Sequence, residues 1–94
     1  MTSWPLRVPA YVSETIRTLH PDLKRKVRAG LDEVRRVPLA GKPLADELQG
    51  VCTHRVGHFR ILYRVHASRS EVEIVAVGPR ESIYLDAVRL LRKG

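Results

Sequence analysis

The stretch from Gln49 to Tyr84, which reads QGVCTHRVGHFRILYRVHASRSEVEIVAVGPRESIY, decides the fold of this chain. β-Branched and aromatic residues alternate with other residues over Val51–Val56 and Phe59–His66, a pattern that predicts two strands. Gly57 between them suits the first central position of a two-residue type II′ turn, because glycine enters positive φ there without strain. The sequence therefore predicts a β-hairpin.

This turn also fixes which residues face each other. It pairs Val56 with Phe59 and Arg55 with Arg60. Two arginines directly opposite each other would destabilise a sheet by roughly 0.2–1 kcal/mol. The pair is therefore either a solvated strand face or a guanidinium clamp for a bound anion. Alternation along the second strand gives a core face (Phe59, Ile61, Tyr63, Val65) and a more polar face (Arg60, Leu62, Arg64, His66).

The residues after the hairpin predict a central strand and a last helix. The run Glu71–Val77 is apolar on both faces, as in a strand that is covered on both sides. Ser82 has the side chain of an N-cap, which predicts a helix from there to about Arg92. Alternation places Val72, Ile74 and Ala76 on one face of the strand and Val75 and Val77 on the other. The buried stripe of the last helix is expected at Ile83, Ala87, Leu90 and Leu91.

Upstream, the pattern predicts a short edge strand and two helices. Trp4–Val8 alternates and is flanked by prolines, which suit an edge. The second helix opens at Pro21 and ends before Pro38. The segment Pro38–Gly50 is expected to be an irregular loop. The apolar stripes are Val12, Ile16 and Leu19 in the first helix and Leu23, Val27, Leu31 and Val34 in the second. Three leucines of the loop are expected to pack against the core: Leu39, Leu44 and Leu48. Tyr63 is expected to pack in the core with its hydroxyl at the rim.

The predicted order is β-α-α-β-β-β-α, with strands and helices segregated, which defines an α+β fold. We expect a small, mostly antiparallel sheet packed on an N-terminal helical hairpin, with a C-terminal helix. The length of 94 residues fits one domain, residues 1–94.

The composition narrows the partners and the compartment. The chain has 17 Lys+Arg and 10 Asp+Glu, a net charge of +7, which favours nucleic acid, an anionic membrane surface or an acidic protein. The single cysteine, Cys52, forms no internal disulfide, and no stretch has the apolar length of a signal peptide or membrane span, so we expect a cytoplasmic protein. Cys52 and His54 lack a second pair of ligands nearby, so neither zinc nor another cofactor is expected.

Three sequence segments, in this order, resemble the RelE/ParE superfamily of bacterial type II toxins. They are the connection P-L-x-G-K-P-L, the hairpin H-R-V-G-H-F-R-I-L-Y and the segment V-G-P-R-E-S-I-Y. The resemblance covers Leu6–Leu91. It implies a metal-independent endoribonuclease that enters the ribosomal A site, cuts mRNA and inhibits translation. It also implies a cognate antitoxin protein as partner.

The resemblance assigns roles to particular residues. Arg60 and Arg80 match the positions that hold the scissile phosphate, and Tyr84 matches the position that stacks on or orients the nucleotide. Arg55 matches a basic residue of the preceding strand. Arginine clamps and an aromatic platform are physically suited to this task. The predicted catalytic set is Arg55, Arg60, Arg80 and Tyr84, and weaker RNA contacts are predicted for Thr53, His54, His58 and Arg64.

The sequence also departs from the RelE pattern. Thr53 stands where a basic residue is expected, and Ile83 precedes Tyr84 where a histidine would serve as acid. His54 or His58 could carry a proton, although alternation points His54 toward the core and His58 lies in the turn. Two alternatives therefore stay open: a ParE-like toxin that acts on DNA gyrase, and a relative that binds RNA without cutting it.

Overall fold

The computed structural model describes residues 3–93, and its centre is one five-stranded sheet with the order β1-β5-β4-β3-β2. β1 runs parallel to β5, and the other neighbouring strands are antiparallel. The α+β class and the mostly antiparallel sheet are therefore confirmed. The strands are β1 (Leu6–Arg7), β2 (Lys42–Pro43), β3 (Cys52–Val56), β4 (Phe59–His66) and β5 (Glu71–Pro79).

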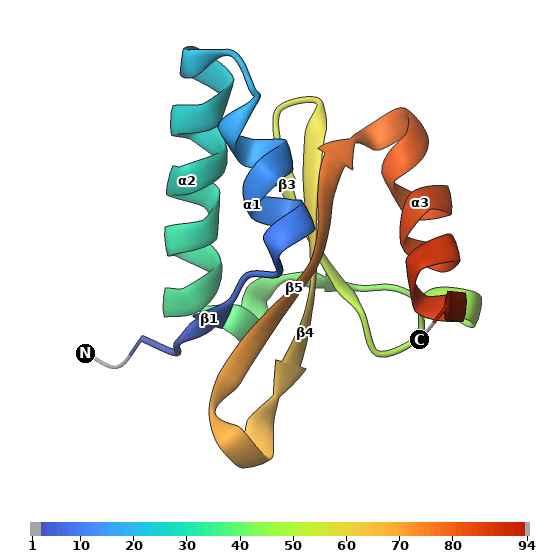
Figure 1. The fold of residues 1–94 in the computed structure, drawn as a ribbon. Helices are drawn as coiled ribbons and strands as arrows, with labels where there is room; N and C mark the ends of the chain where they lie inside the picture. Colours follow the sequence, from blue (N-terminus) through green and yellow to red (C-terminus); the bar gives the residue numbers. More distant parts are fainter. Residues whose placement is uncertain (1–2, 94) are drawn as a thin grey trace.

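The helices cover the two faces of this sheet unequally (Figure 1). α1 (Ala10–Arg17) and α2 (Pro21–Arg36) pack together on one face, and α3 (Arg80–Lys93) lies on the other. We call these the hairpin face and the α3 face. Apolar side chains from β3, β4 and β5 meet α1 and α2 on the hairpin face (Val56, Ile61, Tyr63, Val72, Ile74, Val77), and a smaller set meets α3 (Leu62, Val75, Ala76).

The β3–β4 hairpin has the predicted register. Val56 pairs with Phe59, and Arg55 pairs with Arg60. Gly57 has a φ of 56°, which is the conformation that a type II′ turn requires at this position. A Gly at the turn therefore sets the positions of both arginines, as the sequence predicted.

The segment Pro38–Gly50 is more ordered than predicted. It contains β2, an edge strand of two residues, between two 3₁₀ turns, Pro38–Ala40 and Asp46–Leu48. β2 contains Pro43, which an edge strand accepts because one side of its ladder is unpaired. Leu48 is buried as predicted, whereas the prediction for Leu39 was wrong, since 81% of that residue is exposed.

β5 departs from strict alternation through a bulge. Leu62 pairs with Ala76 and Tyr63 pairs with Ile74, so Val75 is an extra residue in β5. Val75 and Ala76 consequently both lie on the α3 face, and Val77 lies on the hairpin face. The predicted faces of Ala76 and Val77 were therefore wrong.

α3 begins earlier than predicted. It follows β5 directly at Arg80, and Ser82 lies within its first turn rather than at its N-cap. The backbone N–H of Arg80 donates to the carbonyl of His58 at 2.8 Å, so the hairpin turn satisfies a donor that a capping side chain would otherwise serve. Ile83 and Ala87 are buried as expected, but Leu90 is 37% exposed.

The N-terminal edge strand is present as predicted but is shorter. The N-terminal edge strand shrinks to Leu6–Arg7, although Trp4 packs against the hairpin-face core as expected. The Tyr63 hydroxyl is buried rather than at the rim, and it donates to the carbonyl of Pro38 at 2.8 Å.

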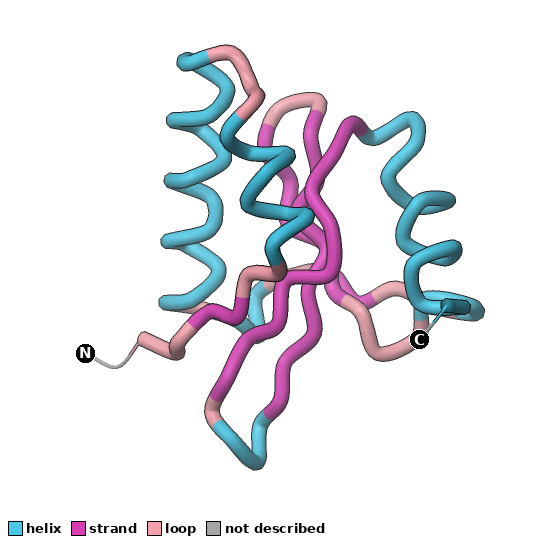
Figure 2. The backbone as a smooth tube through the Cα atoms, viewed as in Figure 1, coloured by secondary structure: helices cyan, strands magenta, loops and turns pink. Residues whose placement is uncertain are grey.

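No helix among residues 3–93 has both the length and the apolar character needed to cross a membrane. A short 3₁₀ turn, Ala67–Arg69, joins β4 to β5, and Figure 2 shows it at the bottom of the view, below the ends of the α-helices.

Candidate anion-binding site

Three arginines gather where the β3–β4 turn meets the start of α3. Arg60 lies between two neighbours in the sheet, with Arg55 as its partner on β3 and Gly78 as its partner on β5. Arg80 follows Gly78 by two residues and opens α3. Tyr84 lies one helical turn further along α3. We call the surface formed by Arg55, Arg60, Arg80 and Tyr84 the arginine end of the α3 face.

Backbone hydrogen bonds hold this end together. The Nη1 atom of Arg60 donates to the carbonyl of Gly57 at 3.0 Å and to that of Phe59 at 2.9 Å. The guanidinium therefore folds over the turn of its own hairpin. The Arg80 N–H donates to the carbonyl of His58 in the same turn. The hairpin turn thus orients one arginine through its side chain and the other through its backbone.

Gly78 allows α3 to lie close to the sheet. A Cβ atom at this position would approach Cδ1 of Ile83 to 2.9 Å, which is closer than real Cβ atoms come. Ile83 is buried in the α3-face core, and Tyr84 packs against that core from a half-buried position. The lack of a side chain at Gly78 therefore leaves room for Ile83, which precedes Tyr84 on α3.

Among the residues that the structure describes, the three arginines of the arginine end form no ion pair with a carboxylate. Within residues 3–93, no acidic side chain lies within ion-pair distance of Arg55, Arg60 or Arg80, and Glu81, although adjacent in sequence, pairs with none of them. Guanidinium groups offer a planar fork of donors that matches phosphate. An uncompensated cluster of this kind can bind a phosphate and stabilise negative charge that develops on it.

Elsewhere on the surface, arginines are paired with carboxylates. Arg25 pairs with Asp22 at 2.9 Å, and Asp32 binds both Arg35 and Arg36. The basic side of α2 is thus partly neutralised within the helix. Pairing of this kind is typical of a solvated helix surface.

The four residues predicted to make weaker RNA contacts lie in four different places. Thr53 lies opposite Leu62, and its buried Oγ1 has no hydrogen-bond partner among the described residues. His54 lies near α2, with Nε2 3.4 Å from a Glu33 carboxylate oxygen. His58 is exposed in the turn beside the arginine end. His54 is therefore separated from the arginines by the sheet, as alternation had indicated.

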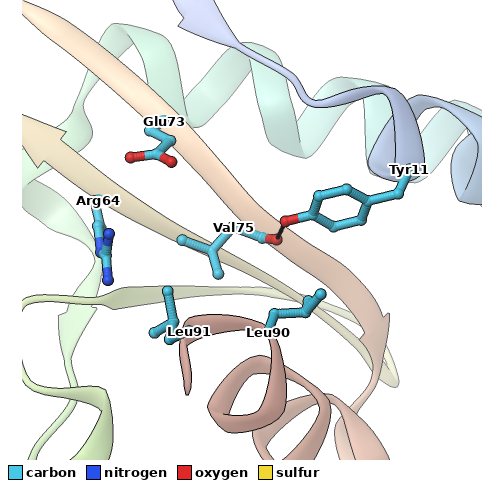
Figure 3. Close-up of a pocket in the computed structure, with 6 residues that line it drawn as sticks. All are labelled: Tyr11, Arg64, Glu73, Val75, Leu90 and Leu91. Atoms are coloured by element: carbon cyan, nitrogen blue, oxygen red, sulfur yellow. Dashed lines mark hydrogen bonds between the residues drawn. The ribbon is translucent and has the colours of Figure 1, made fainter. Parts of the chain in front are cut away.

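Arg64 lies at the opposite end of the α3 face. It pairs across the sheet with Glu73 and lines a cleft of about 430 Å³. Figure 3 shows Arg64 and Glu73 on the same side of this cleft, without a hydrogen bond between them, and Leu90 and Leu91 of α3 as the facing wall. α3 covers Leu62, which lies between Arg60 and Arg64 on the strand. The structure therefore does not bring Arg64 together with the arginine end.

Carboxylates balance the positive charge at this second end. Glu71 binds Arg7 at 3.0 Å and Arg69 at 3.5 Å. Glu73 is hydrogen-bonded to Nε2 of His66 at 2.8 Å. That hydrogen bond, followed by the nearby positive charges, lowers the pKa of Glu73 although burial opposes the shift. We call the surface of Arg7, Arg64, His66, Arg69, Glu71 and Glu73 the paired end.

Metal and thiol chemistry receive little support from the described residues. Within residues 3–93, no three histidine, cysteine or acidic side chains are grouped as metal ligands. Burial raises the pKa of the Cys52 thiol, which therefore stays protonated near neutral pH.

Tyr11 is a residue that the sequence did not single out. It lies off the apolar stripe of α1, and its hydroxyl donates to the carbonyl of Val75 in β5 (Figure 3). The only signal in the sequence is an aromatic residue outside the stripe. Its partner is 64 residues away, so local pattern could not indicate the contact.

The fold is shared with solved structures of bacterial toxins. A chain of the toxin–antitoxin complex RelBE2 from Mycobacterium tuberculosis superposes with a TM-score of 0.76 and 30% identity, covering 84% of this chain and 100% of that chain. An arginine mutant of Escherichia coli toxin RelE in the free state gives 0.73 and 21% identity, over 94% and 97% of the two chains. The YoeB/ParE toxin from Agrobacterium tumefaciens gives 0.70 and 19% identity, over 81% and 98%. The fold thus defines a RelE-like toxin scaffold.

Sequence comparison then identifies the family. Residues 9–84 match the model of the ParE toxin of the type II toxin–antitoxin system parDE. Toxin RelG of Mycobacterium tuberculosis (strain ATCC 25618 / H37Rv) is 39% identical over 59 residues, which are 62% of this chain and 68% of RelG. The chain belongs to the ParE toxin family, within the RelE/ParE superfamily of type II toxins.

Proposed function

We propose that this toxin is a metal-independent, ribosome-dependent endoribonuclease that cuts mRNA and inhibits translation in the cytoplasm. The observation that carries the proposal is the arginine end, where Arg55, Arg60 and Arg80 occupy neighbouring positions and, within residues 3–93, no carboxylate is in ion-pair distance of them. A surface built only to be soluble would gain from acidic partners there, as α2 does. A phosphodiester would supply the missing negative charge.

Arg60 and Arg80 would hold the scissile phosphate from two sides. The 2′-oxygen of the preceding nucleotide attacks phosphorus, the bond from phosphorus to the 5′-oxygen breaks, and the products are a 2′,3′-cyclic phosphate and a 5′-hydroxyl. Guanidinium groups stabilise the charge that grows on the phosphate oxygens. Tyr84 would orient the nucleotide by stacking on a base. Arg55 would add a further contact to the backbone of the RNA.

The reaction also moves two protons, one from the 2′-hydroxyl and one to the leaving 5′-oxygen. Arginine is an unsuitable base because it stays protonated in proteins. His58 is the imidazole beside the arginine end, because His54 faces α2. We assign the proton-carrying role to His58. Thr53 replaces the basic residue expected at that position, and its buried hydroxyl is given no contact with the RNA.

A cognate antitoxin is the expected protein partner. Several structures with this fold were solved as toxin–antitoxin complexes, including those from Mycobacterium tuberculosis and Pyrococcus horikoshii. An antitoxin that covered the arginine end with acidic side chains would neutralise the charge that the RNA needs.

The second candidate function is inhibition of DNA gyrase, as the resemblance to ParE implies. The match of residues 9–84 to the ParE toxin model favours it, as does the uncharged Thr53. The arginine end would then contact gyrase or its DNA. A toxin that binds RNA without cutting it is the third possibility.

Primer extension on a translated mRNA in a purified ribosome system separates these functions. Discrete cuts within A-site codons are expected for the wild type, and their loss is expected in Arg60→Ala. Cuts on free RNA as well as on ribosomes would contradict ribosome dependence. Intact mRNA together with loss of supercoiling activity in a gyrase assay would overturn the proposal in favour of the second function. Salt-sensitive RNA binding without cuts or gyrase inhibition would mark the third.

A further inference from the structure

The bulge at Val75 decides which residues of β5 reach the arginine end. Without the extra residue, alternation from Ile74 would turn Gly78 toward α1 and α2 and Val77 toward α3. With it, Val77 joins the hairpin-face core and Gly78 pairs with Arg60. The bulge thus places the strand end that leads into Arg80 next to the β3–β4 hairpin.

Tyr11 bonds the bulged residue itself. β1 pairs with β5 only at Val72 and Glu73, so the edge of β5 beyond that point lacks a neighbouring strand. The Val75 carbonyl would be left unpaired there, but the Tyr11 hydroxyl reaches across from α1 and donates to it (Figure 3). Desolvation, with Glu73 nearby, raises the pKa of Tyr11, so the hydroxyl keeps its proton and donates at neutral pH.

We infer that Tyr11 is a positioning residue for the arginine end: its hydroxyl fixes the Val75 bulge and thereby the register of Gly78 and Arg80 against Arg60. It touches none of the reacting groups and acts only through β5. Its role in catalysis rests on the proposed ribonuclease function, whereas its effect on the register of β5 does not. The bond joins the helical hairpin to the strand that leads into α3, two parts of the fold that are far apart in sequence.

The test is Tyr11→Phe, which removes one oxygen and keeps the ring. The matched control is Tyr63→Phe: the backbone of Tyr63 flanks the bulge on β4, but the hydroxyl that the substitution removes donates to the Pro38 carbonyl and not to β5. Amide hydrogen exchange of the full chain is measured by NMR. In Tyr11→Phe we expect the Val77, Gly78 and Arg80 amides to exchange about three- to tenfold faster relative to those of α2, as loss of one net hydrogen bond implies.

Tyr63→Phe is expected to change exchange without this selectivity, since its bond anchors the segment after α2. If both variants show the same pattern, or if the amides near Arg80 are unchanged in Tyr11→Phe, the inference is overturned. This arm needs no ribonuclease activity, so its outcome is independent of the proposed function.

A second readout connects the register to catalysis. If the wild type cuts mRNA, Tyr11→Phe should lower the cleavage rate at saturating ribosomes about three- to tenfold while RNA affinity changes less than about twofold. A parallel loss of affinity would contradict a purely positioning role. An unchanged cleavage rate together with faster exchange near Arg80 would overturn the link to catalysis and leave the structural role of Tyr11 intact.

Discussion

Arg60 and Arg64 lie on the same face of β4, four residues apart, but they have different surroundings. At the arginine end, Arg55 faces Arg60 across the hairpin, and no carboxylate of residues 3–93 is in ion-pair distance of either. At the paired end, Arg64 faces Glu73, and Glu71 binds two further arginines. α3 covers the strand between them at Leu62.

This difference shows that an arginine on this face is not by itself a sign of RNA binding. At the paired end, Glu71 binds Arg7 and Arg69, and Glu73 binds His66, so a phosphate that approached Arg64 would meet two carboxylates. The arginine end offers donors that no acidic side chain of the described residues uses. The four predictions below test this contrast, in order of decreasing effect.

The largest effect is expected from Arg60→Ala and Arg80→Ala. Each should lower growth arrest and mRNA cleavage at least about tenfold without unfolding the protein, because each removes a group that stabilises charge in the transition state. Arg64→Ala is the matched control on the same face and should change cleavage less than about twofold. Growth arrest is compared at equal protein level, and thermal unfolding checks the fold. An equal loss in Arg64→Ala would remove the distinction between the two ends.

Tyr84→Ala should lower cleavage about tenfold and RNA affinity no more than about threefold, because one lost stacking contact misplaces the nucleotide while the arginines still bind. Tyr84→Phe keeps the ring and is the control. Single-turnover cleavage and filter binding give the two quantities. Equal losses in both would contradict the orienting role, and a changed circular dichroism spectrum would indicate a packing defect in the α3-face core instead.

A carboxylate placed at the arginine end should make it resemble the paired end. His58→Glu, in the exposed turn, is expected to weaken RNA binding about three- to fivefold at low salt, since a negative charge then competes with phosphate for the guanidinium groups. His58→Gln controls for loss of the imidazole and should bind with wild-type affinity. Affinities are measured over a range of salt concentrations. If the Glu and Gln variants bind RNA equally well, a carboxylate at this position does not weaken RNA binding, and the contrast between the two ends does not explain RNA affinity.

The smallest effect is a pH dependence of stability at the paired end. The pKa of Glu73 is lowered from its ordinary value of 4.5, chiefly by the hydrogen bond from His66. A depressed folded-state pKa stabilises the protein above the ordinary value, and this contribution is lost as pH falls through the folded-state pKa. Glu73→Gln should therefore flatten the acid side of the stability profile, measured by urea unfolding from about pH 6 to about pH 3. Identical slopes in both proteins would exclude a contribution from Glu73.

The sequence predicted the elements whose pattern is local. Alternation and Gly57 gave the β3–β4 hairpin with its pairing of Arg55 and Arg60. Helical spacing gave α2 with its start at Pro21. The sequence also supplied the residue types of the candidate site, and alternation correctly placed His54 on the side away from the arginines. In these cases the deciding neighbours lie within a few residues along the chain.

Tertiary structure decided the rest, because the deciding contacts join distant residues. The bulge at Val75 depends on the pairing of β5 with β4 and is bonded by Tyr11 from α1. The start of α3 at Arg80 depends on the His58 carbonyl, which replaces a cap that the sequence placed at Ser82. The pairing of Arg7 with Glu71 spans 64 residues. The alternation of the sequence predicts which face of a strand each arginine occupies, but only the folded arrangement determines which arginines lie beside a carboxylate, as Arg7 does beside Glu71.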